Sequence, residues 1–184
     1  MKHVTIAFMT DLLANVSQAI ANSSVREFIL YALTNVPGLP PIIQSVHICA
    51  IAVVMGSIMF VNLRILGLAV PSQQPSEMIR RLLPWTWWAL PFLFASGVVF
   101  VIARPVRYFF NPVVGIKFSL LIPALVLAAT LHALSRTEPE YWEITAQRRG
   151  LARIIAAISI LLWLSVMMAG RWIAYADYLF WPES

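Results

Sequence analysis

Five ionisable side chains lie within or at the edges of long apolar stretches, and they are the residues of this sequence best suited to chemistry. They are His47, Arg64, Lys117, His132 and Arg171. Ionisable groups inside a membrane are costly, so each is a candidate for a functional role. Arginines near the end of a membrane helix have a simpler explanation, because their long side chains reach the polar interface. His47 lies about two helical turns inside its apolar stretch, and lipid alone does not explain it.

The rest of the sequence shows which elements must position these residues. The 184 residues are 60% hydrophobic and 11% charged, with a mean hydropathy of +0.80, whereas a soluble domain is about a quarter charged. A hydrocarbon core of about 30 Å needs roughly 20 apolar helical residues. Four stretches meet that length: residues 41–69, 84–103, 113–134 and 152–174. Because their connections are short, we expect an all-α integral membrane protein, an up-down bundle of four transmembrane helices.

The N-terminal segment, residues 1–39, differs from the transmembrane domain that we expect over residues 40–184. Between residues 4 and 33, apolar residues recur at helical spacing, although Asp11 interrupts the run. This pattern predicts an amphipathic interfacial helix, or a pair of helices, lying at the membrane surface. Ser24 is the expected N-cap of the second helix. An arm packed against a partner is the alternative for the same segment.

The candidate residues fall into two groups, because consecutive spans run in opposite directions. His47, in the first span, and Lys117, in the third, are expected at one membrane face. The end of the fourth span brings Met167 and Arg171 to the same face. His132 belongs to the opposite face and differs from Lys117 by about 22 Å in depth, at 1.5 Å per residue. The two histidines are therefore not expected to be the axial ligands of one haem.

The group that contains His47 has the composition of a haem site. Neutral imidazole is a common ligand of haem iron, and a methionine or an amine can take the sixth position. We therefore expect haem b here, with iron held by His47 and with Lys117 or Met167 on the other side. Arg171 is a candidate partner for a propionate. A Cu(I) site that uses His47, Cys49 and methionines is an alternative, because that ion prefers soft ligands.

The net charge of +5 predicts a membrane orientation and no nucleic-acid partner, because no basic cluster forms on a soluble face. Seven Lys and Arg residues belong to the face that holds the first and third connections, and six belong to the opposite face. Excess positive charge marks the cytoplasmic side, so both termini are expected outside. Arg64 is expected to reach the cytoplasmic interface beside Arg80 and Arg81. The single cysteine, Cys49, excludes an intrachain disulfide.

Three segments give the chain a resemblance to a known family: "LPPIIQSVHICAIAVVMGSIMFVNLRILGL", "NPVVGIKFSLL" and "LLWLSVMMAGRWIAYAD". With the motifs H-x8-G-x5-[ND]-LR-x-LG and GRWIAY, they resemble an uncharacterised bacterial family of four-span membrane proteins, a domain of unknown function. The resemblance implies a multi-pass protein of the bacterial inner membrane. With the charge bias, it implies periplasmic termini.

A more distant resemblance is to the HemJ-type protoporphyrinogen oxidases and the CopD-like copper-resistance proteins. It rests on the first-span histidine, the glycine that follows it and the arginine near the end of that helix. In HemJ-type proteins a first-span His and a third-span Lys serve a b-type haem. The resemblance gives those roles to His47 and Lys117.

Four hypotheses about function remain open at this point. The leading one is a b-type haem protein that transfers electrons or serves as a redox-associated membrane subunit. The others are a HemJ-like oxidase that uses haem and a quinone, a cofactor-free accessory subunit of a larger membrane complex, and a copper-handling membrane protein. All four place the chain in a lipid bilayer, and an oligomer is compatible with each.

Overall fold

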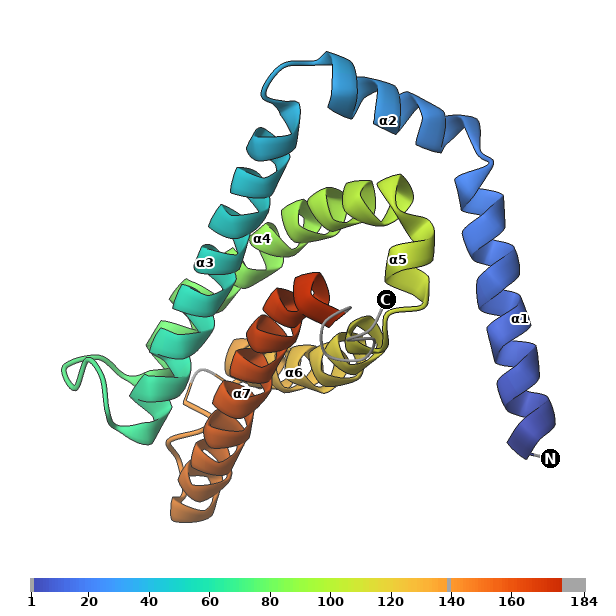
Figure 1. Ribbon diagram of the computed structural model, residues 1–184. Helices are drawn as coiled ribbons and strands as arrows, with labels where there is room; N and C mark the ends of the chain where they lie inside the picture. The colour runs from blue at the N-terminus through green and yellow to red at the C-terminus, as the bar shows by residue number, and fades with distance from the viewer. Residues whose placement is uncertain (1, 139, 177–184) are drawn as a thin grey trace.

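The structure is a computed structural model that describes residues 2–138 and 140–176 (Figure 1). This part of the chain consists of helices and their connections, and it contains no strand. The helices are α1 (Lys2–Ala21), α2 (Ser24–Asn35), α3 (Leu39–Leu66), α4 (Pro75–Ala103), α5 (Pro105–Phe109), α6 (Pro112–Thr137), α7 (Ala146–Trp172) and the short 3-10 helix η1 (Ile173–Tyr175).

Four helices of the described chain, α3, α4, α6 and α7, are long and apolar enough to cross a membrane. α3 packs against α4 and α7, and α6 packs against the same two helices. The four therefore form a closed bundle in which α3 and α6 lie on a diagonal. The predicted all-α bundle of four transmembrane helices is confirmed, and the chain is a multi-pass membrane protein.

The centre of the bundle is apolar and receives side chains from all four spans. Ala124 of α6 and Ala156 of α7 are fully buried, and such small residues let membrane helices approach closely. One polar contact crosses this centre, because Asn62 Nδ2 donates to Ser159 Oγ at 3.0 Å and so links α3 to α7. The Oδ1 atom of Asn62 is buried without a hydrogen-bond partner in the described structure.

Two spans begin earlier than hydropathy predicts. α4 starts at Pro75 and not at residue 84, and α7 starts at Ala146 and not at residue 152. Proline suits the first turn of a helix, and the Thr145 side chain caps α7 by accepting from the backbone N–H of Arg148. At 1.5 Å per residue, the 29 residues of α4 cover about 43 Å. Hydropathy detects only the part of such a helix that fits the hydrocarbon core.

The N-terminal segment forms a pair of helices, which is one of the two forms expected for residues 4–33. Ser23, and not Ser24, is the N-cap of α2: its Oγ accepts from the backbone N–H of Arg26 at 3.2 Å. α1 lies against α5, and α2 lies against α4 (Figure 1). Neither helix is among the candidate spans of the described chain. Their position at the membrane surface stays a prediction.

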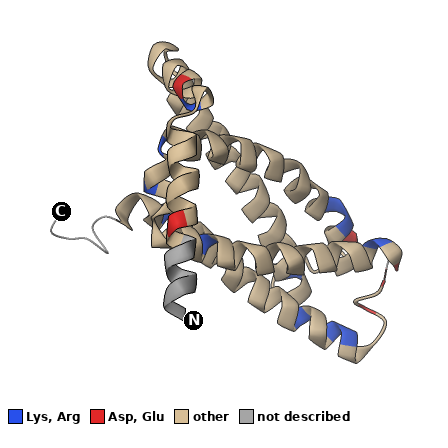
Figure 2. Ribbon diagram, turned by 90° about the vertical axis from the view of Figure 1, so that its right-hand side faces the viewer, with Lys and Arg blue, Asp and Glu red and all other residues tan. Residues whose placement is uncertain are grey.

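The connection between α3 and α4 is held by Arg64. Its guanidinium donates to the backbone carbonyls of Gln73 and Pro71, so Arg64 anchors this loop in addition to lying near the interface. Gly67, with a φ of 83°, ends α3 in the left-handed conformation that glycine adopts freely. Figure 2, where Lys and Arg are blue on the ribbon, shows basic residues at the ends of the spanning helices.

The connection between α6 and α7 closes the same end of the bundle. A carboxylate oxygen of Glu143 accepts from the backbone N–H of Ser76 at 2.9 Å, in the first turn of α4. Trp142 is only 2% exposed and belongs to the apolar core. The loop is therefore fixed both by its packing and by a cap on α4.

Candidate functional site

Each of the four spans has a polar residue or a glycine near one end of the bundle. At this end α3 and α6 begin, and α4 and α7 end. We call it the His47 end. His47 lies about two turns into α3, and Lys117 lies just over one turn into α6. Ser96 and Gly97 lie about two turns before the end of α4, and Gly170 lies in the last turn of α7. His47 and Lys117 therefore share one face of the membrane domain, as the sequence predicts.

The imidazole of His47 is held by a hydrogen bond to α4. Its Nδ1 atom lies 2.7 Å from Ser96 Oγ, and Ser96 donates to the backbone carbonyl of Phe92. The His47 side chain is half-buried. Its Nε2 atom has no hydrogen-bond partner within the described residues. Nε2 is therefore the ring atom that remains available to a ligand.

The two polar side chains each lie beside a glycine of another helix. A Cβ at Gly170 would lie 3.8 Å from Nζ of Lys117, and a Cβ at Gly97 would lie 3.8 Å from Cε1 of His47. Both distances are ordinary van der Waals contacts. Glycine at these positions lets each polar side chain lie directly against the backbone of the neighbouring helix.

His47 and Lys117 come from the diagonal helices α3 and α6. Both residues lie near the starts of these helices, at the His47 end. In the part of the chain that the structure describes, Lys117 has neither a hydrogen-bond acceptor nor an ion-pair partner. A half-buried amine and a half-buried imidazole nitrogen thus share this end of the bundle without protein partners.

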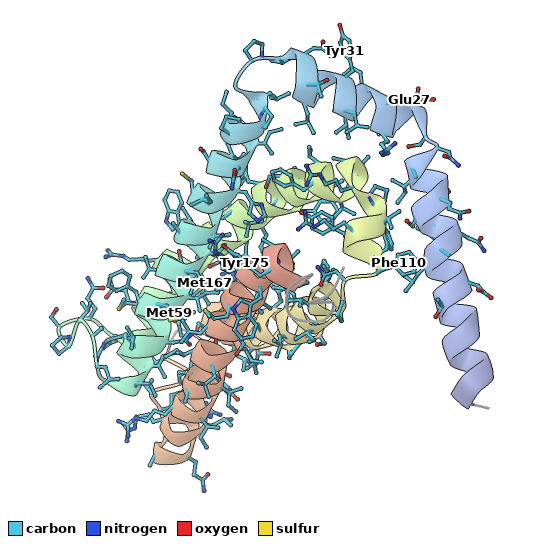
Figure 3. All side chains as sticks on the ribbon, viewed as in Figure 1. Glu27, Tyr31, Met59, Phe110, Met167 and Tyr175 are labelled. Carbon is cyan, nitrogen blue, oxygen red and sulfur yellow. The ribbon has the colours of Figure 1, made fainter. Side chains whose placement is uncertain are left out.

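The other two site residues predicted from the sequence, Met167 and Arg171, are exposed residues of α7, and Figure 3 labels Met167. Met167 is 42% exposed, because its helical position points between the interior and the lipid. Arg171 is exposed, and it donates to the hydroxyl of Tyr175 at 3.0 Å. Its guanidinium carbon lies 5.1 Å from the centroid of that ring. The role of Met167 as a ligand stays a prediction, and Arg171 lies at the exposed surface near the His47 end.

His132 occupies the other half of the bundle and has a partner of its own. Its Nδ1 atom accepts from Trp87 Nε1 at 2.6 Å, and the two rings are nearly parallel with centroids 6.1 Å apart. The pair links α6 to α4. A structural role on this chain thus accounts for His132, and the depth argument that separates it from His47 holds.

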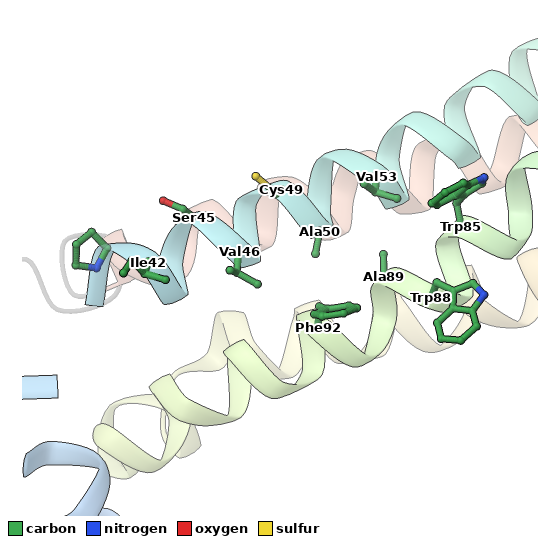
Figure 4. Close-up of a pocket in the computed structure, with 11 residues that line it drawn as sticks. Ile42, Ser45, Val46, Cys49, Ala50, Val53, Trp85, Trp88, Ala89 and Phe92 are labelled. Carbon is green, nitrogen blue, oxygen red and sulfur yellow. The ribbon is translucent and has the colours of Figure 1, made fainter. Parts of the chain in front are cut away.

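The copper hypothesis needs His47 and Cys49 to share an ion, and the helix geometry separates them. Side chains two residues apart on an α-helix are about 160° apart around the helix axis, so they point to nearly opposite sides. Cys49 lines an apolar groove of about 600 Å³ between α3 and α4, whereas His47 is hydrogen-bonded to Ser96. Figure 4 shows Ala50 and Ala89 facing each other across this groove.

Ser96 is the residue of this site that sequence reasoning did not identify. Serine is common in membrane helices and usually bonds to a carbonyl of its own helix, so its type carries little information. The small pair Ser96 and Gly97 in the run "FASGVV" was the available signal. Only the rotation of α4 against α3 reveals that the hydroxyl meets His47.

Comparisons with curated proteins and with solved structures give no match to this chain. The distant resemblance to HemJ-type and CopD-like proteins is therefore not shown and stays a prediction. One family matches residues 21–176, so the match begins where α1 ends and covers all four spans. The sequence resemblance to a membrane family without an assigned function is thus confirmed: the chain belongs to the family of unknown function DUF6644.

Proposed function

We propose that this protein binds haem b at the His47 end of the bundle and transfers electrons in the membrane, alone or as a subunit of a redox complex. One observation carries the proposal. An imidazole whose Nε2 atom and an amine whose Nζ atom have no partner among the described residues lie at the same end of the bundle, on its two diagonal helices. Leaving such groups unpaired in lipid is costly, and a ligand would remove that cost.

The available donors suit haem iron. The porphyrin supplies four of the iron ligands, so the protein needs to supply one or two. A bare metal ion bound by protein alone needs a larger set. Over the described residues, no group of three or more His, Cys, Asp or Glu side chains is placed to hold one.

Each residue of the site would have a separate task. His47 would bind iron through Nε2. Lys117 would act either as a second iron ligand through its amine or as an ammonium partner of a propionate, and Arg171 is another candidate for the propionates. Bound haem supplies reversible one-electron transfer, while the protein sets its orientation and its surroundings.

A visible spectrum of the purified protein tests the proposal. The chain is expressed under haem-replete conditions, purified in detergent, and measured in the oxidised and dithionite-reduced forms. We expect a Soret band, a sharpened α band on reduction, and about one haem per chain by pyridine haemochrome assay. A protein that carries no haem under these conditions contradicts the proposal and supports a cofactor-free accessory subunit.

The same preparation separates the remaining hypotheses. A HemJ-like oxidase would consume protoporphyrinogen with a quinone as electron acceptor, whereas an electron-transfer subunit would not. A copper-handling protein would retain copper that metal analysis detects. The inner-membrane location and the periplasmic termini are further parts of the proposal, and the positive-inside rule supports them.

A further inference from the structure

The hydrogen bonds around His47 decide which of its two nitrogens carries the proton. A hydroxyl has one hydrogen to donate, and a backbone carbonyl can only accept. The contact between Ser96 Oγ and the carbonyl of Phe92 is therefore a hydrogen bond only if Ser96 donates. Its single hydrogen is then used, so Ser96 Oγ must accept from His47. The imidazole consequently holds its proton on Nδ1 and presents an unprotonated Nε2.

From this accounting we infer that Ser96 is a positioning residue, which fixes the tautomer and the ring orientation of His47 so that the Nε2 lone pair faces a ligand. The inference rests on the proposed haem function and deepens it. Histidines that bind metals in proteins almost always donate their other N–H to a neighbouring acceptor, which orients the ring and raises the basicity of the ligand. Ser96 gives His47 such an acceptor before any ligand is bound.

His132, the second histidine of the bundle, is expected in the other tautomer and serves as a comparison. His132 accepts from Trp87 Nε1 through Nδ1, and an indole N–H can only donate. His132 must therefore hold its proton on Nε2. His47 and His132 are therefore expected in opposite tautomers. Ser96 fixes the first and Trp87 fixes the second.

The tautomers can be measured without haem. Ring-labelled ¹⁵N histidine is introduced into the haem-free protein, and spectra are recorded well above the ordinary histidine pKa of about 6.5. Signals are assigned with His47→Ala and His132→Ala. We expect an unprotonated Nε2 for His47 and an unprotonated Nδ1 for His132. In Ser96→Ala the His47 preference should be lost, while the His132 signals stay unchanged.

Ser96→Ala, Ser96→Thr and Ser119→Ala then test the consequence for haem. Ser119 is the matched control, because its hydroxyl also bonds to a carbonyl of its own helix, that of Ile116, but it is exposed and contacts no histidine. We expect haem affinity to fall about 10- to 100-fold in Ser96→Ala and its midpoint potential to rise. Ser96→Thr, which keeps a hydroxyl, and Ser119→Ala should match the wild type.

The outcomes separate the inference from the proposed function. If wild-type His47 carries its proton on Nε2, or if Ser96→Ala changes neither the tautomer nor the affinity, the role of Ser96 is refuted while haem binding stands. If the tautomers are as expected and no haem binds, the proposed function fails, together with the role of Ser96 in it. A Ser96→Ala protein that loses haem but keeps the wild-type His47 tautomer also counts against the inference. Monodisperse elution and an unchanged helical circular dichroism spectrum confirm that each variant is folded.

Discussion

At the residue scale, the ionisable side chains of the bundle differ in what they already contact. Arg64, His132 and Arg171 each donate or accept a hydrogen bond with a neighbour on this chain. Among the described residues, His47 uses one ring nitrogen in this way, and Lys117 has no such partner. This difference, and not the mere presence of ionisable groups in lipid, distinguishes the His47 end as the candidate site.

The hydrogen bond between Asn62 and Ser159 is expected to stabilise the packing of α3 against α7. We expect Asn62→Leu, which keeps the branched shape without the amide, and Ser159→Ala to be coupled when the free energy of unfolding is measured in detergent. Hydrogen bonds between membrane helices contribute about 0.6 kcal/mol on average and up to about 1.7 kcal/mol, and the coupling energy should lie in that range. The measurement is a double-mutant cycle. Additive effects of the two changes would mean that the 3.0 Å contact does not stabilise the bundle.

The sequence predicted part of this site and missed the rest for a physical reason. The alternation of the spans is enough to place His47 and Lys117 at one end and His132 at the other. It does not give the rotation of each helix about its axis. That rotation exposes Met167, which the sequence had made a ligand candidate, and it brings Ser96 to His47, which the sequence did not suggest.

At the scale of elements, the spans were predicted well and their ends poorly. Hydropathy locates the apolar centre of a helix, whereas its ends depend on caps and turns. Ser23 caps α2, Glu143 accepts from the first turn of α4, and Gly67 closes α3. The short helix α5, between α4 and α6, was not predicted, because its five residues are too few to show a period.

Two glycines at different places in their helices should respond oppositely to alanine. Gly67 has a φ of 83°, and an L-residue in this left-handed region costs about 1–2 kcal/mol. Gly150 lies inside α7, and, apart from its chain neighbours and the backbone of its own helix, no described atom lies within 4 Å of the position that an alanine Cβ would take there. Alanine at this position should therefore stabilise the helix by about 0.5–1 kcal/mol. Gly67→Ala is expected to lower the free energy of unfolding and Gly150→Ala to raise it. Changes of the same sign in a detergent unfolding titration would contradict this account of the α3 end.

At the scale of the whole molecule, the distribution of charge orients the bundle. The end opposite to His47 carries Arg64 and the arginines of the first two turns of α4 and of α7 (Figure 2). Some of these arginines form ion pairs, such as Arg81 with Glu77 and Arg148 with Glu138, both at 3.4 Å. The excess, seven basic residues against six on the opposite face, predicts the cytoplasmic side of the bundle.

Cysteine labelling in intact cells tests this orientation. In a background where the native cysteine is replaced, Cys49→Ala, single cysteines are placed at Ser72 and at Asn35, which are exposed at opposite ends of the bundle. We expect an impermeant thiol reagent to label the Asn35→Cys protein, because its end faces the periplasm. The Ser72→Cys protein should react only after the cells are lysed. The reverse pattern would place the His47 end in the cytoplasm.

The measurement that tests the central claim most directly is the Soret absorbance of two histidine variants. His47→Ala should abolish the Soret band while the protein still inserts and elutes as the wild type does, because the Nε2 ligand is lost. His132→Ala removes the same ring from the other half of the bundle, where its partner is Trp87, and should keep the band. A Soret band of wild-type intensity in His47→Ala, or its loss in His132→Ala alone, would contradict the assignment of the site to the His47 end.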